Sequence, residues 1–429
     1  MIKILHLSDI HIGSGFSHGR TNPETGCNTR LEDFQVTLGR CIDRAIAEPV
    51  DLVLFGGDAF PDATPPPLIK EAFATQFRRL VEAQIPTVLL VGNHDQYSQG
   101  QGGASLGIYR TLGIPGFVVG DRLETHLIQT RPGAIQVITL PWLTRSTLLT
   151  RPETAELSLE SVNQLLIDKL KVALEGEIRR LDPALPVVLL AHVMVDKASL
   201  GAERFLAVGK GFTVPLSLLN RPCFDYVALG HVHKHQNLNP SNDPPVVYPG
   251  SIERVDFSEE KEDKGFVLIE LEQDRVHWEF CPLSVRSFCT IKVDISKLDP
   301  PKCDPATPDS TQPDPSQART PQAEILKAIA TDQIQGAVVR LIYQLRPDQL
   351  DYIDTGKLYQ ALEPAHSFSI QPELVSQLAR PRAPELKANS SLDPIESLKT
   401  YLKGREDLQD LELELVAAAQ QLLAGEVPD

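Results

Sequence analysis

Long apolar runs are missing from this 429-residue sequence, and none approaches the roughly 20 consecutive apolar residues that a membrane-spanning helix requires. Cysteine is scarce as well. The six cysteines form no Cys-x-x-Cys pair, and their spacing fits neither a zinc ribbon nor a disulfide framework. Met1 leads straight into the apolar stretch IKILHLSDI, without the charged, apolar and cleavage regions of a secretory leader. We therefore expect a cytoplasmic protein that has no membrane partner.

Basic residues are also outnumbered: the sequence has 41 lysines and arginines and 57 aspartates and glutamates, which gives a net charge of -16. Such a balance argues against a protein that coats nucleic acid without sequence preference. It does not exclude a nuclease, because bound divalent metals and a partner subunit can both supply positive charge where phosphate binds. The chain length and the 42% of hydrophobic residues indicate a globular protein of two or three domains.

Five Val/Leu/Ile-rich runs share one design, in which an apolar stretch without polar alternation ends in polar side chains. Runs of this kind are typical of strands that are covered on both faces. Helical periodicity separates them over residues 30–47, 66–83 and 161–181. Strands that alternate with helices predict an α/β fold. The polar ends are Asp9 with His11, Asp58, Asn93 with His94 and Asp95, His192, and His231 with His233.

The composition changes after residue 280. Residues 281–378 are predicted to form a small α+β domain, interrupted by a Pro/Asp-rich insertion at 299–322 that cannot bury a core. Residues 379–391 are predicted to be a linker. Residues 392–429 carry apolar side chains at helical spacing, which indicates one or two amphipathic helices.

The polar ends of the five runs are expected to meet, because ligands of open α/β sheets bind beyond the carboxyl ends of the strands. Carboxylate, imidazole and amide oxygen without thiolate suit Mn²⁺, Fe²⁺ or Zn²⁺. Seven ligands exceed the needs of one ion with open positions, whereas two ions about 3.5–4 Å apart that share a carboxylate would use them all. The predicted ligands are Asp9, His11, Asp58, Asn93, His192, His231 and His233.

Three different polar residues follow the third run consecutively. We interpret Asn93 as a neutral oxygen ligand, His94 as a catalytic ring beside the metal pair, and Asp95 as the group that orients this ring. Taken singly, each motif also has a structural explanation, such as a polar turn or a helix cap. Their joint occurrence, in this order and each after an apolar run, favours the metal site.

The order and wording of these motifs resemble the calcineurin-like metallophosphoesterase superfamily over residues 1–280. The resemblance implies a β-sandwich flanked by helices and two ions that support in-line hydrolysis of a phosphoester. It also implies that Asp58 bridges the ions and that His94 protonates the leaving oxygen or stabilises the transition state. The implied ligands are Asp9, His11, Asp58 and His233 for the first ion and Asp58, Asn93, His192 and His231 for the second.

The segment VVYPGSIERVDFSEEKEDKGFVLIEL (246–271) and the opening MIKILHLSDIHIG resemble the SbcD family, the nuclease subunits of SbcCD complexes. This resemblance implies a Mn²⁺-dependent nuclease of DNA repair, recombination and replication. Its activities would be 3′-to-5′ exonuclease on duplex ends and endonuclease on single strands or hairpins. Residues 281–378 would be a DNA-facing cap, and residues 392–429 would dock an SbcC-like coiled-coil ATPase. A homodimer of the nuclease subunit is also compatible with the family.

Two positions and two other functions stay open at this point. Arg254 in SIERVDF is a candidate contact for a DNA phosphate or an ordinary surface salt-bridge residue. Pro61 stands where many archaeal and eukaryotic relatives have a second histidine, which leaves the positioning of a DNA end undecided. A stand-alone phosphoesterase for a small nucleotide or phosphoprotein would suit the acidic composition but would not account for the cap and tail. The complete ligand set with His94 disfavours a non-catalytic scaffold.

Overall fold

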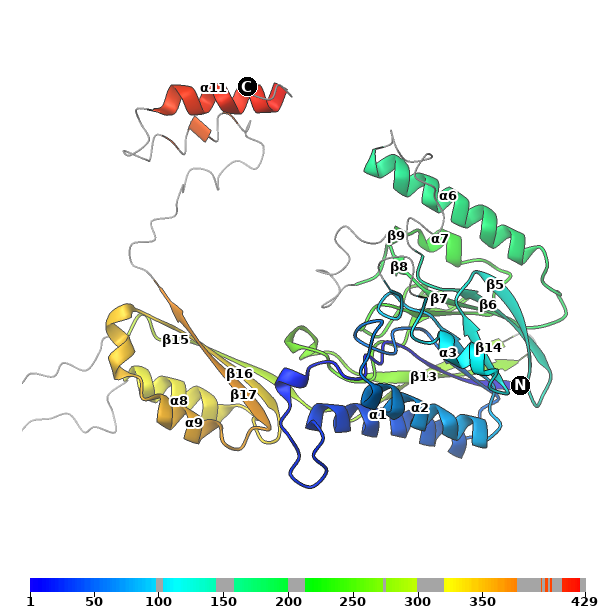
Figure 1. Ribbon diagram of the computed structural model, residues 1–429, viewed down its shortest axis with the longest axis horizontal. Helices are drawn as coiled ribbons and strands as arrows, with labels where there is room; N and C mark the ends of the chain where they lie inside the picture. Colours follow the sequence, from blue (N-terminus) through cyan, green and yellow to red (C-terminus); the bar gives the residue numbers. More distant parts are fainter. Residues whose placement is uncertain are drawn as a thin grey trace, which may run out of the picture. The chain divides into compact units, whose positions relative to one another are not determined.

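The computed structural model divides the chain into two compact units (Figure 1). The first comprises Met1–Thr290, Gln333–Arg340 and Leu362–Ser369, and the second comprises Ile291–Asp332, Leu341–Ala361 and Ile370–Asp429. The structure describes residues 1–97, 103–143, 158–199, 213–272, 275–298, 320–375, 395, 398–399, 402 and 411–424. The predicted linker 379–391 and residues 299–319 of the predicted insertion lie outside these ranges.

The first of two six-stranded sheets has the strand order β14-β13-β1-β2-β3-β4. Strands β1 to β4 run parallel, and β13 is antiparallel to both β1 and β14. The register aligns Leu7 with Phe55 and Phe55 with Leu89, so three parallel strands end at one edge. The strands are β1 (Ile2–Leu7), β2 (Leu52–Phe55), β3 (Thr87–Leu90), β4 (Phe117–Gly120), β13 (Gly265–Glu272) and β14 (Arg275–Pro282).

The second six-stranded sheet has the order β11-β12-β10-β7-β6-β5. Its four central strands run parallel, and both edge strands are antiparallel to their neighbours. Gly230 of β10 pairs with His192 of β7, which brings the ends of these two strands together. The strands are β5 (Glu124–Gln129), β6 (Ala134–Leu140), β7 (Val187–His192), β10 (Tyr226–Gly230), β11 (Gln236–Asn237) and β12 (Val246–Tyr248).

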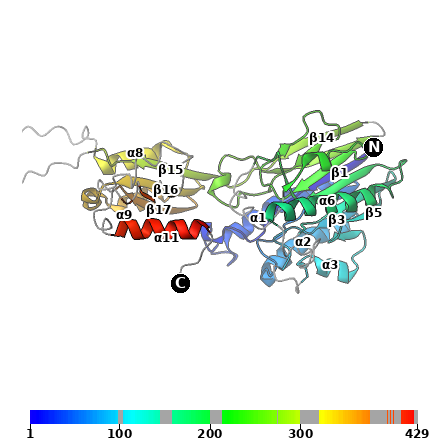
Figure 2. The same cartoon turned by 90° about the horizontal axis from the view of Figure 1, so that it is seen from above.

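The two sheets form a sandwich whose interior is apolar. Ile4 and Val88 from the first sheet share one buried cluster with Val188 from the second. Alternate side chains of a strand point to opposite faces, so Leu5 packs outward on α1 and α2 and Leu189 packs outward on α6. Figure 1 shows α6 on the opposite side of the sheets from α1 and α2, and in Figure 2, which is seen from above, α6 lies in front. This arrangement confirms the predicted α/β fold with a sandwich flanked by helices.

The three predicted helices of the first unit are confirmed, with ends displaced by at most three residues. Helix α1 (Thr29–Ala47) follows Asn28, whose side chain accepts a hydrogen bond from the Arg30 amide at 2.9 Å. Helix α2 (Pro67–Glu82) starts on proline, whose missing N–H is not needed there. Helix α6 (Leu159–Ile178) follows Ser158, another side-chain cap. Helices α3 (Gly107–Leu112) and α7 (Leu216–Leu219) are short.

After residue 287 the predicted order of strand, helix, strand, helix and strand is confirmed. The strands form one sheet in the order β15-β16-β17. Helix α11 (Glu412–Ala424) belongs to the predicted tail. None of the described helices combines the length and apolarity needed to cross a membrane. The elements are β15 (Phe288–Asp294), α8 (Pro321–Thr331), β16 (Val338–Leu345), α9 (Thr355–Leu362) and β17 (Ser367–Leu374).

Candidate metal centre

The seven predicted ligands lie in or directly after parallel strands, at the edge where those strands end. Asp9 and His11 follow β1, Asp58 follows β2, Asn93 follows β3, His192 ends β7, and His231 and His233 follow β10. Of the six non-glycine residues with positive φ in the described ranges, four are predicted ligands. These are Asp9 (52°), His11 (46°), Asp58 (58°) and His231 (102°). A positive φ at a non-glycine residue costs about 1–3 kcal/mol of conformational free energy, and residues strained in this way cluster at functional sites.

The first group of ligand atoms comes from Asp9, His11 and His233, within 4.8 Å of one another. His11 Nε2 lies 3.0 Å from His233 Nε2 and 3.6 Å from Asp58 Oδ2. All four side chains are buried. The two ring nitrogens therefore point at one small volume beside the Asp58 carboxylate.

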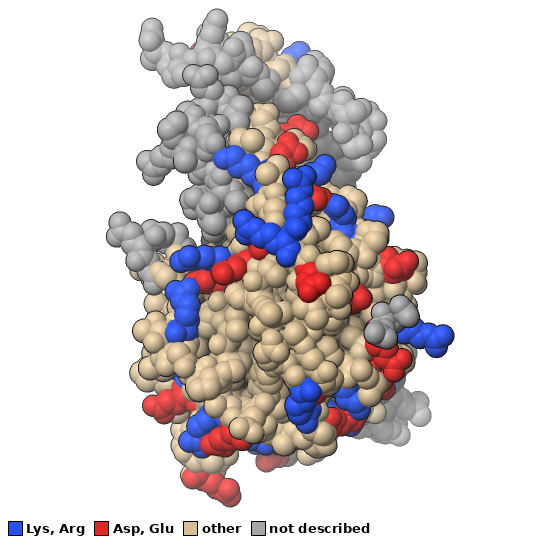
Figure 3. All heavy atoms as spheres, turned by 90° about the vertical axis from the view of Figure 1, so that its right-hand side faces the viewer, with Lys and Arg blue, Asp and Glu red and all other residues tan. Residues whose placement is uncertain are grey.

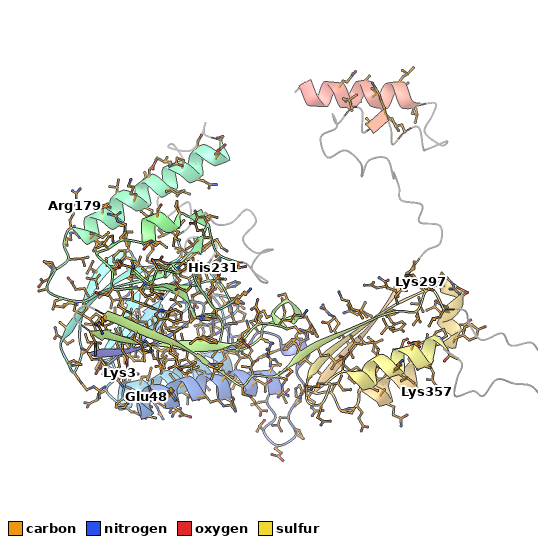
Figure 4. The ribbon with its side chains drawn as sticks, turned by 180° about the vertical axis from the view of Figure 1, so that it is seen from behind. Lys3, Glu48, Arg179, His231, Lys297 and Lys357 are labelled. Carbon is orange, nitrogen blue, oxygen red and sulfur yellow. The ribbon has the colours of Figure 1, made fainter. Side chains whose placement is uncertain are left out.

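The second group comes from Asp58, His192 and His231, again within 4.8 Å. His192 Nε2 lies 3.5 Å from Asp58 Oδ2. Asn93 Oδ1 lies 3.0 Å from His192 Nε2 and 2.9 Å from His231 Nδ1. Asp58 Oδ2 thus lies near His11 on one side and His192 on the other, which is the position that a bridging carboxylate needs. Figure 4 labels His231 within the body of the first unit.

The chemistry of these groups fits two divalent cations. Burial lowers the pKa of His11 and lowers that of His231 to about 3, so both rings are neutral and offer lone pairs. Nitrogen and oxygen donors without sulfur suit Mn²⁺, Fe²⁺ or Zn²⁺. Two such cations supply Lewis acidity toward a phosphoryl oxygen and lower the pKa of a water molecule.

The carboxylates of the centre have different electrostatic surroundings. Burial raises the pKa of Asp58, but His192 and His11 beside it bring the pKa well below its usual range. Burial raises the pKa of Asp9 to about 6. Its two oxygens accept hydrogen bonds from the His231 amide at 3.1 and 3.0 Å. The neighbouring histidines therefore keep the Asp58 carboxylate ionised at its position between the two ligand groups.

His94 stands beside the ligand groups, as predicted. Its ring centre lies 5.0 Å from that of His11, and its amide donates to Asp58 Oδ1 at 2.8 Å. Its Nδ1 lies 2.8 Å from the Pro61 carbonyl oxygen, which can only accept, so the proton is on Nδ1. The carbonyl of Pro61 therefore fixes the tautomer and orientation of the ring, and Nε2 remains for proton exchange.

The predicted pairing of Asp95 with the His94 ring is wrong. The Asp95 carboxylate turns away and accepts hydrogen bonds from the amides of Asp58 at 2.9 Å, Gly92 at 3.0 Å and Ala59 at 3.1 Å. It is fully buried, and burial raises its pKa to about 7. Asp95 thus ties the loop after β3 to the loop after β2, because those loops leave amides without strand partners.

A family model described as calcineurin-like phosphoesterase matches residues 2–235, more than half of the chain. The chain belongs to the calcineurin-like phosphoesterase family. The matched range contains all seven predicted ligands and His94. The sequence-based prediction of a metal-dependent phosphoesterase is confirmed at the level of this family.

Curated relatives of this phosphoesterase include two SbcD proteins, each named as a subunit of the nuclease SbcCD. The one from Rhodobacter capsulatus is 29% identical over 63% of this chain and 66% of its own length. The one from Staphylococcus epidermidis is 25% identical over 66% of this chain and 70% of its own length. The chain thus matches about two thirds of each, and the predicted resemblance to the SbcD family is confirmed. A dimetal phosphatase from Danio rerio superposes with a TM-score of 0.40 at 14% identity, covering 65% of this chain and 95% of that one.

Arg254, for which a contact with a DNA phosphate and an ordinary surface role were both left open, donates hydrogen bonds within the phosphoesterase itself. Nε donates to the Glu259 carbonyl at 3.1 Å, Nη1 to the Arg286 carbonyl at 3.1 Å and Nη2 to the Glu262 carbonyl at 2.9 Å. Three of the five guanidinium N–H groups therefore serve backbone acceptors. These contacts give Arg254 a structural role, and its contact with a DNA phosphate stays a prediction. Arg254 fastens the loop over residues 254–262 because this loop presents backbone carbonyls that no strand satisfies.

Replacing Arg254 with alanine is expected to lower the free energy of unfolding by about 2 kcal/mol, because three carbonyls lose a charged donor. Thermal denaturation measures the loss. Arg78→Ala is the control, since its exposed ion pair with Glu82 contributes less than about 0.5 kcal/mol. A raised KM for DNA at unchanged stability would instead support the substrate-binding role.

The roles of three residues near the centre were not predicted from the sequence. Pro61 acts through its carbonyl, which no side-chain pattern reveals. The Trp142 ring lies against His231, with centroids 4.8 Å apart and planes 34° apart. Glu259 Oε1 accepts a hydrogen bond from His233 Nδ1 at 2.6 Å. Glu259 belongs to the charged run SEEKEDK, which is more typical of a solvated loop.

Proposed function

We propose that the protein is a Mn²⁺-dependent DNA nuclease, the catalytic subunit of an SbcCD-like complex in DNA repair, recombination and replication. It would degrade duplex ends in the 3′-to-5′ direction and cut single strands or hairpins internally. One observation carries this proposal: all seven ligands of the resemblance and His94 converge at one edge of the sandwich. The similarity to nuclease subunits supports DNA as the substrate.

The two ligand groups support the proposed division of the ligands. Asp58 would belong to both positions, because its Oδ2 atom lies within 3.6 Å of one histidine from each group. The first position would be held by Asp9, His11, Asp58 and His233. The second position would be held by Asp58, Asn93, His192 and His231.

His94 would be the catalytic proton donor. For this step the ring would carry two protons, one on Nδ1 held by the Pro61 carbonyl and a second on Nε2. The Nε2 proton would pass to the leaving oxygen of the phosphodiester, and the ring would return to its neutral form. The hydrogen bond from its amide to Asp58 keeps this residue beside the bridging carboxylate. Proton transfer by a residue so placed contributes about 10²–10⁴-fold to the rate.

The second half of the chain supports a DNA substrate and a protein partner. Residues 281–378 would be the DNA-facing cap. Two copies of the nuclease subunit would form a homodimer. Residues 392–429 would dock an SbcC-like coiled-coil ATPase. Within this segment, the exposed fraction is 87% for Leu413 and 38% for Leu415 of α11, and 45% for Leu411 directly before the helix. Exposed leucines on a helix are typical of a surface that a partner covers.

A stand-alone phosphoesterase for a small nucleotide or a phosphoprotein is the second candidate. The net charge of -16 favours it, because duplex DNA is repelled by an acidic surface. On the face shown in Figure 3, basic and acidic side chains lie interspersed around a central area of other residues. DNA binding would therefore depend on the cations and on a partner for much of its positive charge.

Degradation of an end-labelled duplex with and without Mn²⁺, and with and without the ATPase partner and ATP, tests the proposal. We expect cleavage only with Mn²⁺, and a higher rate when the partner hydrolyses ATP. A small chromogenic phosphodiester serves as the comparison substrate. Preference for this small substrate over DNA would favour the second candidate.

Deleting residues 392–429 is expected to abolish co-purification with the ATPase, because the exposed leucines of α11 are removed. Cleavage of single-stranded DNA by the subunit alone should persist, since the ligands all precede residue 234. An affinity pulldown with the full chain as control measures the effect. Unchanged recovery of the partner would assign docking to another surface.

A further inference from the structure

Glu259 is a buried carboxylate with three fixed partners. Its Oε1 atom accepts from His233 Nδ1 at 2.6 Å. Its Oε2 atom lies 2.8 Å from Lys264 Nζ and accepts from the Val255 amide at 3.0 Å. The Glu259 and Lys264 side chains are both inaccessible to solvent. A charge buried in this way is costly unless its partners are in place, so these residues are stable as a unit.

Lys264 fastens the same unit from a second direction. Its Nζ atom donates to the carbonyl of His233 at 3.2 Å and to Glu262 Oε2 at 2.8 Å. One ammonium group thus contacts the carboxylate that holds the His233 ring and also the backbone that carries this ring. Burial raises the pKa of Glu259, but the His233 ring and Lys264 together bring it below its usual range.

The other histidines of the centre have different outer partners. His192 Nδ1 faces the Gly56 carbonyl at 2.7 Å, and His94 Nδ1 faces the Pro61 carbonyl at 2.8 Å. His231 directs Nδ1 at Asn93, and its Nε2 atom has no hydrogen-bond partner among the described residues. Among these four rings, His233 alone pairs its outer nitrogen with a carboxylate that is not a proposed ligand. The two metal positions therefore differ in their outer partners.

We infer that Glu259 is a positioning residue that makes the two metal positions unequal in affinity, so that the position served by His233 binds a divalent cation more tightly. This inference rests on the proposed function, because it takes His233 as a ligand. The carboxylate keeps the proton on Nδ1 and leaves the Nε2 lone pair directed toward His11. It also raises the basicity of that lone pair.

Calorimetric titration of metal-free full-length protein with MnCl₂ tests the inference. Wild-type protein should bind two ions in two steps of different affinity. Glu259→Gln should weaken the tighter step by about 10–100-fold and leave the weaker step unchanged. The neutral amide can still accept the hydrogen bond from His233 Nδ1, but it does not raise the basicity of Nε2 as the carboxylate does. Glu260→Gln is the matched control, an identical change at the next residue. Equal titrations for all three proteins would overturn the inference.

A measurement on wild-type protein keeps the test decisive if the variant does not fold. Crystals grown with one equivalent of Mn²⁺ should show anomalous scattering beside His11 and His233. Scattering that is strongest beside Asn93 and His192 would reverse the order of affinities and overturn the inference.

The two proposals fail in different ways. If wild-type protein binds Mn²⁺ in two unequal steps and Glu259→Gln weakens the tighter step, but the wild type leaves DNA intact, the proposed function fails and the role of Glu259 stands. If wild-type protein binds Mn²⁺ and cuts DNA while Glu259→Gln titrates like wild type, the role of Glu259 fails and the function stands.

Discussion

Asparagine in place of Asp58 is expected to abolish Mn²⁺-dependent cleavage, with a loss of at least about 10³-fold in rate. Asp58 Oδ1 accepts the His94 amide at 2.8 Å, so asparagine keeps its oxygen there and turns its NH₂ group toward His11 and His192. A hydrogen-bond donor then occupies the place of the bridging oxygen and repels a cation. The variant should also bind fewer Mn²⁺ ions, as measured by calorimetry.

Glutamine in place of His94 is the matched comparison for Asp58→Asn. It removes the proposed proton donor and spares every proposed ligand, so Mn²⁺ binding should persist while cleavage falls by about 10²–10⁴-fold. Circular dichroism establishes that both variants are folded. Cleavage at the wild-type rate by either folded variant would show that the assigned centre is not where the reaction occurs.

Alanine in place of Gly92 is expected to disable the same centre without changing any ligand. A Cβ atom at this position would lie 2.5 Å from the Asp58 amide nitrogen and closer still to its Oδ1 atom. The backbone of both loops must move to relieve this contact, at a cost of about 1–3 kcal/mol. Displacing a catalytic group by about 1 Å lowers the rate about 10²-fold, so cleavage should fall by at least that amount.

The control for Gly92→Ala is Gly107→Ala. Gly107 opens helix α3, and a Cβ atom there would meet nothing within 4 Å. Cleavage assays and Mn²⁺ titration of both variants should therefore separate the effect of the site from that of an added methyl group. Wild-type Mn²⁺ affinity in Gly92→Ala would mean that the two loops yield without moving Asp58.

The strands and helices of the first unit followed from local pattern. The runs that became β2, β3 and β7 are apolar at nearly every position, because each is covered by helices on one face and by the other sheet on the opposite face. Polar side chains directly after such runs must lie at the end of the sheet. That rule located the seven ligands and His94, since it depends only on which residue follows each strand.

The hydrogen-bond partners of the centre were not predictable in the same way. Asp95 adjoins His94 in the sequence but accepts from Asp58, 37 residues away, because its side chain turns toward amides left bare where β2 and β3 end. Arg254 lies in a segment that resembles the SbcD family, yet its guanidinium group reaches three carbonyls of its own chain. Neighbours in sequence therefore do not identify partners in a loop.

Local sequence by itself determined where the strands end and which side chains stand at their ends, because hydrophobic periodicity is a short-range property. Tertiary structure alone decided how those side chains are held. The Pro61 carbonyl behind His94 and the Glu259 carboxylate behind His233 come from loops whose course is set by packing across the whole unit. Burial then makes each of these contacts obligatory, since a polar group removed from water must find a partner within the protein.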